Sequence, residues 1–170
     1  ISDGVTEMSL RIPAAATEIA GVAEAAGQLG IKTEDILQFS EVMINLGVAT
    51  NLSAEEAASS LAKFANITGM SADNYSRLGS VIVDLGNSMA TTEKDIVAMG
   101  MNIASAGKQA GLTEDQIMGM AAALSSVGLE AEAGGTAISR LLIQMQTAAE
   151  TGAQAAQTIA STGYTLRELE

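Results

Sequence analysis

The chain has 170 residues, of which 48% are apolar but only 2% aromatic, and it contains one proline against 17 glycines. Its apolar content is therefore mainly Ala, Leu, Ile, Val and Met, which suits closely packed helices better than a sheet sandwich. Eight basic and 20 acidic residues give a net charge of −12, which opposes direct nucleic-acid binding and adsorption to anionic lipid. Cysteine and histidine are absent, which excludes disulfides, the usual zinc ligands and the commonest general base.

Helical spacing of apolar residues dominates the chain from residue 13 onward. Leu78, Val81 and Ile82, for example, stand at i, i+3 and i+4, the spacing of one helix face. Such spacing predicts helices over residues 13–29, 34–49, 54–68, 72–86, 92–110, 114–127 and 136–150, and a weaker one over 153–162. Thr165 is the predicted cap of a further helix. The predicted fold class is all-α.

A short phrase of Gly, an apolar residue and Ser or Thr separates several of these helices. It occurs as Gly69-Met70-Ser71 and Gly111-Leu112-Thr113, with one insertion as Gly30-Ile31-Lys32-Thr33, and with Asn for Gly as Asn51-Leu52-Ser53. The phrase predicts a helix end in the left-handed conformation, an apolar residue that folds back on the helix, and a new N-cap. Gly and Asn adopt that conformation at the lowest cost.

Acidic residues follow the predicted caps. Nine of the 20 acids stand there: Glu34, Asp35, Glu55, Glu56, Asp73, Glu93, Asp95, Glu114 and Asp115. The helix dipole favours negative charge in a first turn, and Ser53 with Glu56, Thr92 with Asp95, and Thr113 with Gln116 have capping-box spacing. We therefore interpret these acids as capping groups and not as catalytic or metal-binding groups.

An internal repeat is predicted because the second half of the chain can be superimposed on the first, with Gly47 on Gly107 and Leu52 on Leu112. The predicted unit has three helices, over about 34–86 and again over 92–150. The expected architecture is a compact bundle or stack of short helices with two approximate 60-residue three-helix repeats. Small residues line many helix faces and bury little area, so we expect a homo-oligomer or a covering partner.

No catalytic, cofactor-binding or metal-binding residue is predicted. Gly134-Gly135-Thr136 lacks both the Gly-Lys-Ser/Thr phrase and the preceding strand of a phosphate-binding loop, so we interpret it as a flexible break followed by a helix cap. Met43, Met120 and Met145 stand at core spacing, which favours ordinary packing over a peptide groove. The longest uncharged apolar-rich stretch, residues 116–129, is shorter than the roughly 20 residues that span a bilayer.

Five phrases identify a family. They are AAGQLGI (25–31), LGVATNLSAEEAA (46–58), FANITGM (64–70), RLGSVIVDLGN (77–87) and AALSSVGLEAEAGGTA (122–137). In this order they resemble the core region of bacteriophage tail tape-measure proteins, the phage-related minor tail protein family. The resemblance covers most of the chain, from about residue 14 to 145, and it comes from no single motif.

The resemblance implies a structural, non-enzymatic segment of a phage or prophage tail protein. Such a protein acts in tail assembly, length determination and genome ejection, inside the tail tube of the virion and in the host cytoplasm during assembly. Its implied partners are tail tube and tail-tip proteins, tail assembly chaperones and further copies of itself, without direct nucleic-acid contact. No cofactor is implied, and the family has no catalytic residues here to carry over.

The expected domain organisation has three parts: an N-terminal linker or fragment end over 1–12, the tape-measure core module over 13–150, and a truncated helical extension over 151–170. No signal peptide is expected at the N-terminus, and we expect the chain to be a segment of a longer protein. The alternative function is a membrane-active helical module that contacts the host membrane transiently during DNA ejection. As one continuous helix the chain would extend roughly 255 Å, but the repeated breaks predict a compact module instead.

Overall fold

The computed structural model describes residues 2–162, which form α-helices and one short 3₁₀ helix and contain no strand. This confirms the all-α prediction. The elements in chain order are α1 (Ser2–Arg11), α2 (Ala16–Gln28), α3 (Ile36–Ala49), α4 (Ala54–Thr68), η1 (Ala72–Asn74), α5 (Tyr75–Ser88), α6 (Glu93–Gln109), α7 (Glu114–Ser126) and α8 (Ala131–Thr162).

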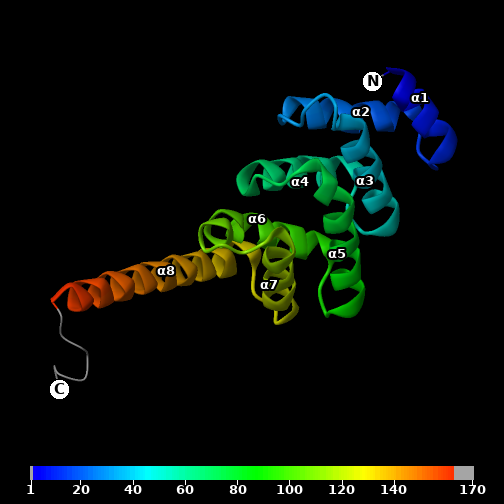
Figure 1. Cartoon of the computed structure of the whole chain (residues 1–170). Coiled ribbons are helices and arrows are strands. Elements are labelled where there is room, and N and C mark those ends of the chain that lie inside the picture. Colours follow the sequence, from blue (N-terminus) through cyan, green and yellow to red (C-terminus); the bar gives the residue numbers. More distant parts are fainter. Residues whose placement is uncertain (1, 163–170) are drawn as a thin grey trace.

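The helices stack in two layers. In one layer α2, α4, α6 and the first part of α8 lie one above another, and each contacts the next (Figure 1). In the other layer α1, α3, α5 and α7 contact each other in the same order. Helices that follow one another in the chain join the layers, as α2 with α3 and α6 with α7 do. This is the arrangement of an α-solenoid, in which helix pairs contact only their neighbours.

The repeating unit is a pair of helices, one from each layer. In one layer α3, α5 and α7 begin at residues 36, 75 and 114, and in the other α4 and α6 begin at 54 and 93. Among these five helices, each one that has a predecessor in its layer begins at the same interval after it. The superposition predicted from the sequence instead places α3 on α6 and α5 on α8, which belong to opposite layers. The predicted three-helix unit is therefore corrected to a two-helix unit.

Buried positions recur at the same interval as the helix starts. The recurring pairs are Phe39 and Leu78, Met43 and Ile82, Ala57 and Ile96, and Phe64 and Ile103. Gly47 and Gly86 also correspond, since a Cβ on Gly47 would lie 2.9 Å from the Ala54 nitrogen and one on Gly86 would lie 2.5 Å from the Glu93 side chain. Because neither glycine has a Cβ, α4 can begin directly against α3, and α6 can begin directly against α5.

Most predicted helix ends are confirmed. Gly30, Gly69 and Gly111 have φ angles of 89°, 68° and 80°, and Ser53 and Thr113 each form a complete capping box. Asn51 is an exception, because no non-glycine residue in the described range has a positive φ. The Thr50 hydroxyl ends α3 instead: it donates to the Leu46 carbonyl at 2.7 Å and accepts from the Leu52 amide at 3.1 Å.

The start of α3 also differs from its prediction. Residues 33–35 form a turn and α3 begins at Ile36, so Glu34 and Asp35 precede the first turn and Thr33 is not its N-cap. The other seven predicted acids do stand in first turns, of α4, η1, α6 and α7. At η1, Ser71 is the N-cap residue but makes no capping hydrogen bond to the backbone.

The two ends of the chain are more helical than predicted. Residues 2–11, expected to be a linker, form α1, because Val5 and Met8 are buried and α1 contacts α2. The expected helices 136–150 and 153–162 are one continuous helix, α8. Thr165 lies outside the described residues.

Gly134 and Gly135, expected to be a flexible break, lie inside α8 and are buried. A Cβ on Gly135 would collide with the Asn102 Cβ, and one on Gly134 would lie 3.1 Å from the Met99 methyl carbon. These glycines therefore permit close packing of α8 on α6. Thr136, expected to be a helix cap, donates from its hydroxyl to the Glu132 carbonyl one turn earlier at 2.9 Å.

Candidate assembly surface

The acidic residues of the described range are spread along the stack and stand mainly at helix starts. No group of three or more Asp or Glu side chains among residues 2–162 is arranged to hold a metal ion. Ten of the acids stand in first helical turns, the seven described above together with Asp3, Glu18 and Glu132, and Glu130 is exposed just before the start of α8.

One ion pair joins successive helices of a layer at their N-termini. The Lys94 ammonium of α6 donates to Glu56 Oε1 of α4 at 2.9 Å, and the Ser53 amide donates to Glu56 Oε2 at 3.0 Å. The hydrogen bond from Lys94, with smaller contributions from Ser53, lowers the pKa of Glu56 from its ordinary 4.5 to about 2. The pair is exposed, so it adds little to stability at high salt.

The stability that Glu56 contributes is expected to disappear in acid. Because its pKa is lower in the folded chain, the contribution is present above about pH 4.5 and is lost as the pH falls through about 2. Urea unfolding at pH 6 and at pH 2 should show that Glu56→Gln is destabilised relative to the wild type at pH 6 and much less at pH 2, where Glu56 of the wild type is partly protonated. Lys94→Met should show the same loss at pH 6, and equal stability of Glu56→Gln and wild type there would contradict the assignment.

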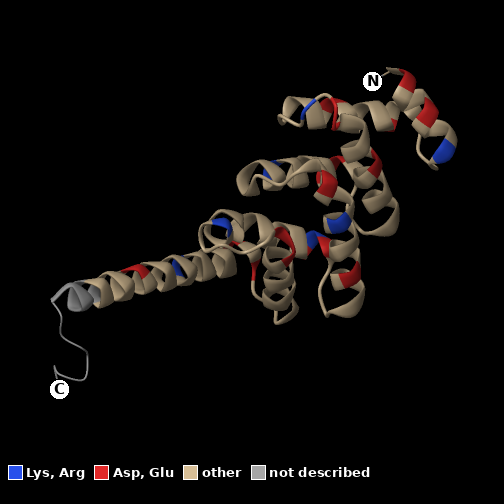
Figure 2. Cartoon of the chain, in the orientation of Figure 1, with Lys and Arg blue, Asp and Glu red and all other residues tan. Residues whose placement is uncertain are grey.

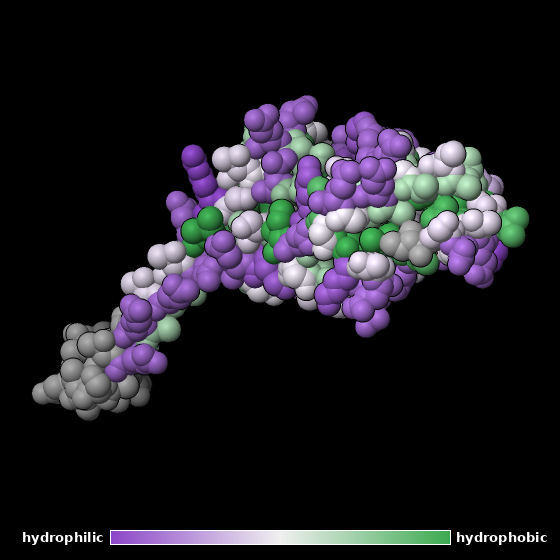
Figure 3. Space-filling model, turned by 90° about the horizontal axis from the view of Figure 1, so that it is seen from above, coloured by the Kyte–Doolittle hydropathy of each residue, from purple (hydrophilic) through white to green (hydrophobic). Residues whose placement is uncertain are grey.

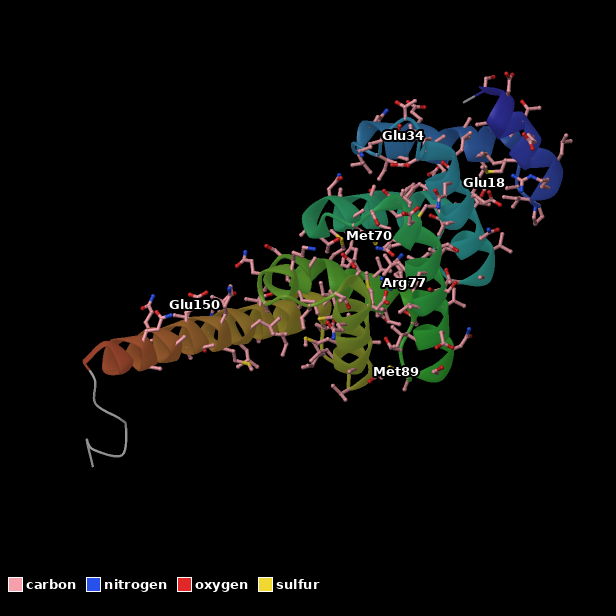
Figure 4. All side chains as sticks on the ribbon, viewed as in Figure 1. Glu18, Glu34, Met70, Arg77, Met89 and Glu150 are labelled. Carbon is pink, nitrogen blue, oxygen red and sulfur yellow. The ribbon has the colours of Figure 1, made fainter. Side chains whose placement is uncertain are left out.

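A groove of about 700 Å³ lies between α3 and α5. Its walls include Val42, Leu46 and Ala49 from α3 and Gly79 from α5, and α5 approaches α3 closely at Gly79, where a Cβ would lie 3.0 Å from Val42. Arg77, labelled in Figure 4, lies at the groove and pairs with Asp115 of α7 at 3.4 Å. The groove thus combines an apolar wall with polar lining residues, among them Asn45, Asp84 and Asn87.

The C-terminal end of the stack is open. α8 extends past α6 as a projecting arm in both side and top views (Figures 1 and 3). Gln146 is half-buried, whereas every described side chain of α8 beyond it is exposed. Five of the eight exposed large apolar residues of the described range belong to this end: Val127, Leu129, Leu141, Ile143 and Met145.

Charge is distributed unevenly along the stack. Residues 1–75 contain ten acidic and three basic residues, whereas residues 128–162 contain three acidic and one basic residue. Figure 2 shows this contrast between the many acidic residues of α1 to α5 and the sparsely charged α8. Glu150, labelled in Figure 4, lies on the part of α8 that no other helix accompanies. The C-terminal end of the stack is therefore less densely charged than its N-terminal part.

This surface is not predicted by the sequence pattern. The apolar spacing predicts Met145 as a core residue, but it is 61% exposed. The spacing shows that the helix has an apolar face and cannot show whether another helix covers that face. Among residues 2–162, no helix has the length and hydropathy needed to cross a membrane.

A two-layer stack of helix pairs, in which each pair contacts only its neighbours, defines a helical repeat protein. The chain matches the phage-related minor tail protein family over residues 2–169. It belongs to that family and is thus a phage tail protein, a virion component with a structural role. No curated protein and no solved structure gave a significant match.

Proposed function

We propose that this chain is a segment of a tail tape-measure protein, with roles in tail assembly, length determination and genome ejection. Membership of the minor tail protein family supports this proposal, as do the five ordered phrases that resemble tape-measure cores. In this role the segment lies inside the tail tube of the virion and contacts tube proteins, tail-tip proteins and assembly chaperones. It acts through packing surfaces and not through catalysis.

The observation that carries the proposal furthest is the stacking of helix pairs, because it predicts how the segment contributes to length. Helices of one layer lie about 8–10 Å apart, so an added pair lengthens a stack by about 10 Å. The residues of one pair, drawn out as a single continuous helix, would add about 58 Å. We therefore propose that the segment is a folded module and that the ruler lies in less interrupted parts of the parent protein.

The test is to duplicate residues 54–92 in the gene of the parent phage and to measure tail lengths by electron microscopy. This range contains one α4–α5 unit and ends before α6. We expect tails whose mean length changes by about 10 Å or less. A mean increase of about 58 Å, the length of a continuous helix, would support a tape-measure role but contradict the folded module.

A matched control separates a length effect from misfolding. The isolated chain with the duplicated pair should unfold cooperatively and remain helical by circular dichroism. If the parent phage forms normal tails when the whole segment is deleted, the proposed role in assembly is wrong.

A further inference from the structure

A pocket of about 350 Å³ lies where the loop between α2 and α3 meets the turn between α4 and α5. One wall comes from residues 30–35 and the other from residues 65–75, and Figure 4 labels one residue of each, Glu34 and Met70. The Asn66 side-chain amide donates to the Leu29 carbonyl at 2.6 Å and holds the two walls together. The volume is in the range of small-ligand pockets. We call it the loop pocket.

The loop pocket is lined by three carboxylates, those of Glu34, Asp35 and Asp73. Among residues 2–162, no hydrogen bond or ion pair reaches any of the three side chains. The first turn of η1 accounts for Asp73, but Glu34 precedes α3, and Asp35 makes no capping hydrogen bond there. Lys32 also lines the pocket, and it is exposed and forms no ion pair with a described residue. Three carboxylates against one ammonium leave the pocket negative.

A buried tyrosine lines the same pocket. Tyr75 is 5% exposed, and its ring packs edge-on against Phe39 with the ring centroids 5.1 Å apart. Its hydroxyl has no hydrogen-bond partner among the described residues. Burial, and in second place the charge of Asp35, raises the pKa of Tyr75, so the hydroxyl lies within electrostatic reach of a pocket carboxylate. Because a buried polar group without a partner costs free energy, this hydroxyl points to a ligand that would satisfy it.

The ligand class follows from how the oxygens are spread. A metal ion needs its ligands close together, and no three acidic side chains within residues 2–162 are arranged to hold one. A guanidinium group has five N–H donors in a fixed fork, so it can reach separate oxygens at once and pair with carboxylates in a bidentate manner.

The apolar part of the loop pocket suits the rest of an arginine side chain. Ile31, Ala65 and Met70 line it and are 6%, 3% and 9% exposed, and the methylene stem of arginine packs on such surfaces. We propose that the loop pocket binds an arginine side chain of a partner protein. This proposal goes beyond the tape-measure role and does not depend on it.

The first test is a titration of the ¹⁵N-labelled chain, followed by amide chemical shifts. N-acetylarginine amide should shift the resonances of residues 30–35 and 65–75 saturably. The matched citrulline compound, which has nearly the same shape without the charge, should not, and the lysine compound should bind more weakly. Free arginine should also bind more weakly, because its carboxylate is repelled by the pocket acids. No saturable shift at the pocket, equal binding of citrulline or lysine, or tighter binding of free arginine would overturn the proposal.

The second test uses variants of the pocket with N-acetylarginine amide as the probe. Asp35→Asn should weaken binding about tenfold and Tyr75→Phe about threefold, through the loss of one partner each, whereas Lys32→Gln should tighten binding because it removes a repelling charge. Asp84→Asn is the matched control, since it makes the same change in net charge at an exposed residue of α5 outside the pocket. All four variants should keep the wild-type circular dichroism. Wild-type affinity of Asp35→Asn, or an equal loss in Asp84→Asn, would show that the pocket is not the site.

Discussion

Replacing Gly47 by alanine is expected to destabilise the chain by about 1–3 kcal/mol, the usual cost of an overpacked contact. Alanine is the better helix former by about 1 kcal/mol, so helix propensity alone predicts the opposite sign. The added Cβ would lie 2.9 Å from the nitrogen and 3.2 Å from the Cα of Ala54. These are backbone atoms at the start of α4, and they cannot move without displacing the helix from α3.

Gly119→Ala is the matched control for this prediction. Gly119 also lies inside a helix, α7, but nothing lies within 4 Å of a Cβ added there. Its replacement should stabilise the chain by about 0.5–1 kcal/mol through helix propensity. Urea unfolding of both variants measures the two signs, and a stabilised Gly47→Ala variant would show that α3 and α4 are not in the described contact.

Truncating Phe64 to alanine is expected to lower the free energy of unfolding by about 3–5 kcal/mol. Phe64 is fully buried in α4, and α4 contacts α2, α3 and α6. A cavity there weakens the contacts of the central helix pair with the pairs on both sides. Because a stack depends on contacts between neighbours, we also expect a less cooperative urea transition, with a smaller dependence on denaturant.

Ile67→Ala provides the comparison for Phe64→Ala within the same helix. Ile67 lies further along α4 and is 42% exposed, so its truncation removes fewer contacts and should cost less than about 1 kcal/mol. Equal losses of unfolding free energy for the two variants would contradict the assignment of Phe64 to the buried face of α4 and of Ile67 to its exposed face.

The helix ends are largely predictable because their chemistry is local. Ser53, Thr113 and Gly69 have close beside them in the sequence everything that a cap requires. The prediction that Asn51 adopts the left-handed conformation is wrong, and the reason for this is also local. A neighbouring hydroxyl, that of Thr50, satisfies the carbonyl of Leu46 and the amide of Leu52, and it removes the need for a left-handed residue.

The stacking order is not predictable in the same way. Caps and apolar faces are alike in both layers, so a superposition that crosses between layers, such as Gly47 on Gly107, looks as regular in sequence as the true one of Gly47 on Gly86. Gly135 shows the same ambiguity at one residue: glycine is typical of a break and also of a close helix contact. Only Asn102, on the preceding helix of the layer, decides between them. The candidate surface on α8 could not be predicted because exposure depends on which neighbours are present.

The two-layer order has a consequence for how the chain acquires its structure. Each helix contacts only the helix pairs next to it, so even the contacts between helices join residues within about one repeat of each other. Short sequence separations of this kind favour rapid folding. They also allow α1 to α4 to pack before α7 and α8 have left the ribosome. Helix α8 is then made after α6, so the helix against which its first part packs is already available when α8 leaves the ribosome.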